Sequence, residues 1–212
     1  MAIGIIHGMM TRDILSGLVG KEQLKRFVKE TEDVDFRLAH GHGAGHRVGK
    51  FQIEFEKYGG KICLDPGAEY QAVRFIREGN LAWAVHFILD GACPEHIFPF
   101  REDIFRLFLS EPHMNFSLYL FLRYKRWSDQ VKNASVTQVN SLEDLKEKIV
   151  ETADWVYQLP CSYLREDDVK IIDPRIGKKL AFRNWEMSDD DIGKILERTS
   201  SLIKGAYNFV SK

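Results

Sequence analysis

Apolar and polar positions alternate along much of the segment from residue 51 to residue 90. The clearest case is Leu81 to Leu89, where large apolar side chains occupy every second position, as they do on one face of a pleated strand. The residues between them are alanine, His86 and Ile88, so this strand has no properly polar face. It is therefore expected to lie at the centre of a sheet that is covered on both sides.

Two neighbouring segments are expected to join this strand in a meander. Tyr70 to Arg77 pairs with it across a turn that contains Gly79 and Asn80, because Gly and Asn tolerate the positive φ angles of tight turns. The alternative is a helix over residues 68–77 that ends at Gly79, and propensity alone does not decide between them. Phe51 to Glu56 also alternates and predicts a half-buried strand.

Helical periodicity appears near both ends of the chain and once in its second half. One short helix is expected after a cap at Thr11, and a second begins at Lys21. Ser141 caps a helix that stops before Pro160, and Ser188 caps the closing helix, whose first turn holds three aspartates. A further short helix is expected at 101–108, and short strands at 36–38, 136–139 and 169–172.

These patterns predict a single α+β domain over residues 1–212. Its sheet is largely antiparallel, built from the meander at 51–90 and a strand near 116–123, and helices from both chain ends cover it. The predicted core consists of Phe51, Ile53, Phe55, Trp83, Val85, Phe87, Leu118, Leu120, Ile149, Ile195, Leu196 and Leu202.

Composition narrows the classes of protein to which this chain can belong. The chain has 212 residues, of which 44% are hydrophobic, and a net charge of −1, values that exclude a disordered protein and a uniformly basic surface. Its three cysteines are too far apart for a disulfide framework, and no run of about 18 apolar residues occurs. We therefore expect a cytoplasmic protein with no membrane partner.

A glycine-rich stretch, HGHGAGHRVG at residues 40–49, offers the most unusual candidate site. Four glycines predict a flexible loop whose backbone can approach a phosphate, and the candidate ligand-binding residues are His40, His42, His46, Arg47 and Lys50. The spacing of known phosphate loops does not match. A metal site would need an acid near the histidines, and the loop holds Ala44 and Gly45 instead.

A second candidate is the stretch RYKRW at residues 123–127. Arg123, Lys125 and Arg126 alternate with aromatic rings, a combination that suits phosphates and stacked bases of single-stranded nucleic acid. The alternative is the basic end of a strand that leaves the core, with its cations reaching water.

Metal-ligating and catalytic residues are not assigned by the sequence. His86, Cys93, His96 and His113 include the CxxH spacing of half a zinc site, but packing is favoured because the second close pair is missing. Asp168 and Lys170 resemble the acid and lysine of metal-dependent nucleases without the partner acid. A rival set is Glu54, Glu56, Lys57 and Asp65.

The function expected from these features is binding of a phosphate-bearing ligand, either a nucleotide or a nucleic acid, by the glycine-rich loop and the basic stretch. One alternative is a metal-dependent phosphodiester hydrolase, and another is a non-catalytic protein–protein module. Cofactors and catalytic residues stay unassigned, and whether the chain is an enzyme stays open.

Overall fold

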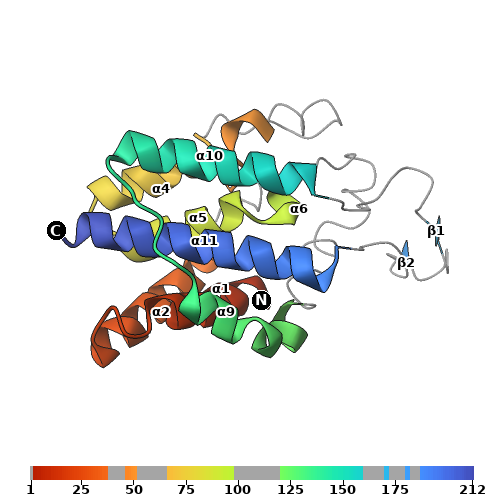
Figure 1. Ribbon diagram of the computed structural model, residues 1–212, viewed down its shortest axis with the longest axis horizontal. Helices are drawn as coiled ribbons and strands as arrows, with labels where there is room; N and C mark the ends of the chain where they lie inside the picture. The colour runs from red at the N-terminus through yellow and green to blue at the C-terminus, as the bar shows by residue number, and fades with distance from the viewer. Residues whose placement is uncertain are drawn as a thin grey trace.

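The computed structural model describes residues 2–37, 46–51, 66–97, 120–159, 170–171, 180–181 and 187–212, and these are mostly helical. The longer helices are α1 (Ala2–Leu15), α2 (Lys21–Arg37), α4 (Ala68–Arg77), α5 (Leu81–Gly91), α10 (Leu142–Gln158) and α11 (Asp189–Val210). In Figure 1, α10 and α11 run side by side along the molecule, and α1 and α2 lie beyond α11. Among the described helices, none has the length and apolar character required to span a bilayer.

The predicted antiparallel sheet is wrong. Within the described residues, strands are limited to β1 (Lys170–Ile171) and β2 (Leu180–Ala181), which pair antiparallel. β1 overlaps the strand expected at 169–172, but these two short strands do not form a sheet on which helices could pack. The chain is therefore a helical assembly in the part that the structure describes.

The segment expected to be the central strand is helix α5. Asn80 is its N-cap, and the side chain of Asn80 accepts a hydrogen bond from the backbone N–H of Trp83 at 3.2 Å. A run in which every residue except His86 is apolar fits a buried helix as well as a buried strand, so alternation within it carried no information about its period. The expected central position is nevertheless correct, because α5 contacts α1, α2, α4, α10 and α11.

The segment before α5 is also helical, which makes the preferred strand over Tyr70 to Arg77 wrong. Helix α4 ends in a Schellman motif: Gly79 has a φ of 75°, its N–H bonds to the Ile76 carbonyl at 3.0 Å, and the Asn80 N–H bonds to the Phe75 carbonyl at 2.8 Å. Gly79 is thus the end signal of a helix, as the alternative interpretation had it, and not part of a hairpin turn.

Several other expected elements differ in type or bounds. Residues 49–51 are helical where the strand from Phe51 was expected, and residues 120–123 are helical and lead into the 3₁₀ helix η1 (Tyr124–Arg126) rather than forming a strand. Thr11 lies inside α1 instead of capping a helix, and Phe36 belongs to α2. Residues 136–139 are extended without forming a strand. The expected helix at 101–108, the strand residues at 52–56 and 116–119, and Leu38 lie outside the described residues.

Three of the expected helix starts are confirmed, two of them by the predicted serine caps. Helix α2 begins at Lys21, Ser141 accepts a hydrogen bond from the Asp144 N–H at 3.0 Å, and Ser188 does the same for Asp191 at 3.0 Å. Helix α10 ends at Gln158, before Pro160, as expected. A short helix, α9 (Ser128–Asn133), packs between α1 and α11.

The core gathers around α5 and the inner faces of α10 and α11. Trp83 is only partly buried, and Ile53, Phe55 and Leu118 of the predicted core lie outside the described residues. The other predicted core residues are buried: Phe51, Val85, Phe87, Leu120, Ile149, Ile195, Leu196 and Leu202.

Candidate metal centre

Helix α5 carries two polar side chains into the core of the protein. His86 and Asp90 are four residues apart, which places them on one face of the helix, and they are 0% and 1% exposed. A carboxylate this deep in a protein needs partners for its charge and for its lone pairs. Those partners are histidines, and they come from other segments as well as from α5.

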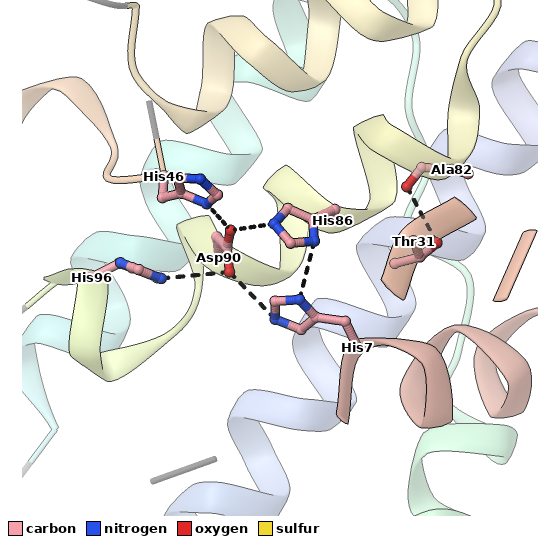
Figure 2. A network of polar contacts seen from close by, with 7 residues as sticks. All are labelled: His7, Thr31, His46, Ala82, His86, Asp90 and His96. Atoms are coloured by element: carbon pink, nitrogen blue, oxygen red, sulfur yellow. Dashed lines mark hydrogen bonds and ion pairs between the residues drawn. The ribbon is translucent and has the colours of Figure 1, made fainter. Parts of the chain in front are cut away.

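Four histidines surround the Asp90 carboxylate, and Figure 2 shows all four rings turned toward it. His86 Nε2 lies 3.0 Å from Oδ2, and His46 Nδ1 contacts the same oxygen. His7 Nε2, from α1, lies 3.3 Å from Oδ1, and His96 Nε2 lies 3.5 Å from it. Each of these histidines is at most 6% exposed. We call the five residues the Asp90 centre.

The two histidines that belong to no long helix are held by local backbone contacts. His96 lies in the short helix α6 (Pro94–Ile97), and its carbonyl accepts a hydrogen bond from Arg47 Nη1 at 3.0 Å. His46 precedes Arg47, whose carbonyl accepts a hydrogen bond from the Ala68 N–H at 2.8 Å at the start of α4. The segment around His46 is therefore attached to both α4 and α6.

The electrostatics of the centre favour an ionised carboxylate. Burial raises the pKa of Asp90, but the combined attraction of His86, His46, His7 and His96 outweighs burial and holds that pKa well below its ordinary value. Asp90 is thus a permanent negative charge in the core near neutral pH, which attracts a cation.

The contact between His7 and His86 restricts where the protons of the two rings lie. Their Nδ1 atoms are 3.1 Å apart, so one ring donates and the other accepts. A neutral imidazole carries a single N–H, and the ring that donates through Nδ1 therefore turns the lone pair of its Nε2 toward the Asp90 carboxylate. The accepting ring carries its proton on Nε2, so a metal ion bound to Nε2 of both rings would leave an N–H on each Nδ1 and would require this contact to open.

The spacing of the ligand atoms suits a metal ion. Two ligands bound about 2.1 Å from one ion, at angles between octahedral and tetrahedral, lie roughly 3.0–3.4 Å apart. The separations of 3.0, 3.3 and 3.5 Å between histidine nitrogens and the Asp90 oxygens lie at or just beyond this range, whereas His46 and Asp90 are in direct hydrogen-bond contact and would have to move apart around an ion. Two groups of three ligands share the carboxylate: His7, His86 and Asp90, and His46, Asp90 and His96.

The donor set indicates which ions fit. Two imidazoles with one carboxylate favour first-row transition metals such as Zn²⁺, Fe²⁺ and Mn²⁺, whereas Ca²⁺ and Mg²⁺ prefer oxygen-only sets. Cys93, a half-buried cysteine, belongs to neither group of ligands. The Asp90 centre therefore has nitrogen and oxygen donors without sulfur.

The glycine-rich stretch contributes to this centre through one histidine. His46 and Arg47 are buried, while Lys50 forms an ion pair with Asp154 of α10. His40 and His42 lie outside the described residues, so a flexible loop there stays a prediction. The structure thus turns the described end of this stretch inward, toward α5, and not outward as a phosphate-binding surface.

The basic stretch lies elsewhere, and its rings are not exposed. Arg123, Lys125 and Arg126 are exposed, and Arg126 forms an ion pair with Asp189 at the start of α11. Tyr124 and Trp127 are buried, and Trp127 Nε1 donates to the Asp189 carbonyl at 3.0 Å. The rings therefore hold η1 to the core and present no surface for stacking bases.

Sequence reasoning considered three of the five residues of the centre, but in separate groups. His46 was grouped with His40 and His42, whereas His86 and His96 were grouped with Cys93 and His113, and His113 lies outside the described residues. His7 and Asp90 were missed. The spacing of His86 and Asp90 inside an apolar run was a usable signal, because i and i+4 meet on a helix, whereas His7 has no neighbouring motif.

Glu69 of α4 is expected to position His46. Both of its carboxylate oxygens accept from the Gly49 N–H at 3.1 Å, and burial raises the pKa of this buried acid. Glu69→Ala leaves that N–H unsatisfied and should lower the free energy of unfolding by about 1–3 kcal/mol in urea titrations. Glu69→Gln keeps an acceptor and should lose less than half as much, and equal losses would contradict the assignment.

No protein-family model matches the chain, and no curated protein matches it. The description of the Asp90 centre therefore rests on the structure alone.

Proposed function

We propose that this protein is a metal-dependent hydrolase in which the Asp90 centre binds two transition-metal ions. The observation that carries the proposal is the sharing of one buried carboxylate by two pairs of histidines, His7 with His86 and His46 with His96. Such a carboxylate bridges two ions in two-metal sites, where the ions lie about 3.5–4 Å apart.

The number of ligands favours a catalytic role over a purely structural one. Each ion would receive two imidazoles and one carboxylate oxygen, which is three protein ligands, whereas structural sites are normally closed by four. A position is then left for water, and metal ions make bound water acidic enough to attack an ester near neutral pH. Phosphodiesters are the substrates to assay first, because two ions neutralise both the attacking and the leaving oxygen.

The experiment combines metal analysis with an activity assay. Protein treated with chelator and then reloaded with Mn²⁺, Zn²⁺ or Co²⁺ is assayed on bis(4-nitrophenyl) phosphate, and bound metal is counted by mass spectrometry. We expect two ions per chain and turnover that requires them. His46→Gln should lose turnover, whereas Asp129→Asn, an exposed acid in α9, should keep it.

The results separate the two parts of the proposal. Two bound ions without hydrolysis of this or any other phosphodiester would contradict the hydrolase and leave a structural centre, and no bound ion would contradict both parts. Binding of a nucleotide or nucleic acid by His40, His42, Arg123, Lys125 and Arg126 stays a separate prediction, which is tested by the salt dependence of oligonucleotide affinity.

A further inference from the structure

A polar cavity lies between α10 and α11, apart from the Asp90 centre. Its volume is about 410 Å³, within the range of small-molecule sites, and it shares no residue with the centre. The extended segment 134–140 crosses α11 at one side of it, where the Thr137 N–H donates to the Ser201 carbonyl at 3.0 Å. Gly205 permits this crossing, since a Cβ there would lie 2.0 Å from the Thr137 carbonyl oxygen.

The wall of this cavity holds Arg198, an exposed residue of α11 whose side chain makes two contacts. Arg198 Nε donates to Thr152 Oγ1 at 3.3 Å, and its guanidinium lies over the Trp155 ring, 5.2 Å from the ring centre. Thr152 is itself buried and donates to the Lys148 carbonyl at 2.8 Å. One edge and one face of the guanidinium are thus occupied, which leaves its two terminal nitrogens as the available donors.

Arg198 differs from the two lysines of this cavity in its ion pairing. Within the described part of the chain, no carboxylate forms an ion pair with it, whereas Lys148 and Lys194 of the same cavity pair with Asp144 at 2.8 Å and Asp190 at 2.5 Å. Glu197, another lining residue, accepts from Gln130 at 2.8 Å. Arg198 is therefore the cation of this cavity that has no ion pair among the described residues, although Glu151 also lines the cavity.

We propose that the cavity between α10 and α11 binds a small anion, a phosphate or carboxylate group, through the terminal nitrogens of Arg198. A planar, pre-oriented guanidinium forms two parallel hydrogen bonds with such a group and loses little side-chain entropy on binding. The hydroxyls of Ser135 and Ser201, 3.4 Å apart in the lining, supply further hydrogen bonds.

The test is calorimetric titration of the metal-free full chain with inorganic phosphate and with malonate, at constant ionic strength and with chloride as the reference anion. Metal is removed so that phosphate cannot bind at the Asp90 centre. Saturable binding of phosphate identifies a phosphate ligand, and saturable binding of malonate identifies a carboxylate ligand. Either result supports the site, and no binding of either anion at about 10 mM would overturn it.

Variants of the protein test whether the anion binds through Arg198. Arg198→Ala should weaken affinity about tenfold or more, and Arg198→Lys should weaken it too, because an ammonium group lacks the planar fork. Arg77→Ala, at an exposed arginine of α4, is the matched control and should bind normally. Unchanged affinity in Arg198→Ala would show that the anion binds elsewhere and would overturn the proposal.

Discussion

Asp90→Asn is expected to destabilise the protein by about 3–5 kcal/mol, the cost of removing one partner from a buried charged network. Asparagine has nearly the same volume, so no cavity forms, but its amide lacks the charge that His7, His46, His86 and His96 share. Its NH₂ group would also face an imidazole N–H. Urea unfolding of the two proteins at pH 7 measures the difference.

The pH dependence of this difference follows from the pKa of Asp90. Because that pKa is lowered in the folded protein, the stabilisation is complete above the pKa of an unfolded aspartate, about 3.9, and is lost as the pH falls further. The gap between wild type and Asp90→Asn should therefore hold at neutral pH and narrow below about pH 4. The exposed variant Asp129→Asn should stay within about 0.5 kcal/mol of wild type, and an equal loss there would contradict a special role for Asp90.

Zn²⁺ or Co²⁺ added to the metal-free protein should stabilise it by about 2.7 kcal/mol for each site whose dissociation constant the free ion exceeds a hundredfold. For a chain of this length, that corresponds to a rise in Tm of roughly 5–10 °C. His96→Gln removes a ligand from one of the two groups and should lose about half of the total rise. Thermal unfolding followed by circular dichroism measures each shift.

Two comparisons identify the ligand atoms that cause the rise in Tm on metal binding. Cys93→Ser should keep it, since Cys93 belongs to neither ligand group. At pH 5 the shift should shrink, because protons compete for imidazoles whose ordinary pKa is about 6.5. A shift that survives in Asp90→Asn, or that is lost in Cys93→Ser, would place the ion elsewhere.

The parts of the fold that the sequence predicted correctly are those with local chemical signals. Ser141 and Ser188 each accept from an N–H three residues later, a contact that depends on adjacent residues alone. The segment that forms helix α5 lacks a contrast between apolar and polar faces, so both the helical and the strand period fit its sequence. Its cap at Asn80 was present in the sequence, but the pair Gly79 and Asn80 also suits a hairpin turn.

The candidate site was less predictable because its residues come from four segments. Only tertiary packing brings His7 of α1 and His46 onto α5, and no spacing in the sequence encodes it. The separation of His86 and Asp90 was informative only if the segment was helical. On a strand, too, they would share a face, but about 13 Å apart, and they would not meet.

The central claim is that the Asp90 centre binds transition-metal ions. X-ray absorption fine structure of the metal-loaded protein is its most direct test. With Zn²⁺ or Co²⁺ bound, we expect about two imidazole nitrogens and at least one oxygen at roughly 2.0–2.2 Å around each ion, with no sulfur. The imidazole signal should disappear in the Asp90→Asn variant. A shell of oxygens alone, a shell that contains sulfur, or an imidazole signal unchanged in Asp90→Asn would contradict the assignment.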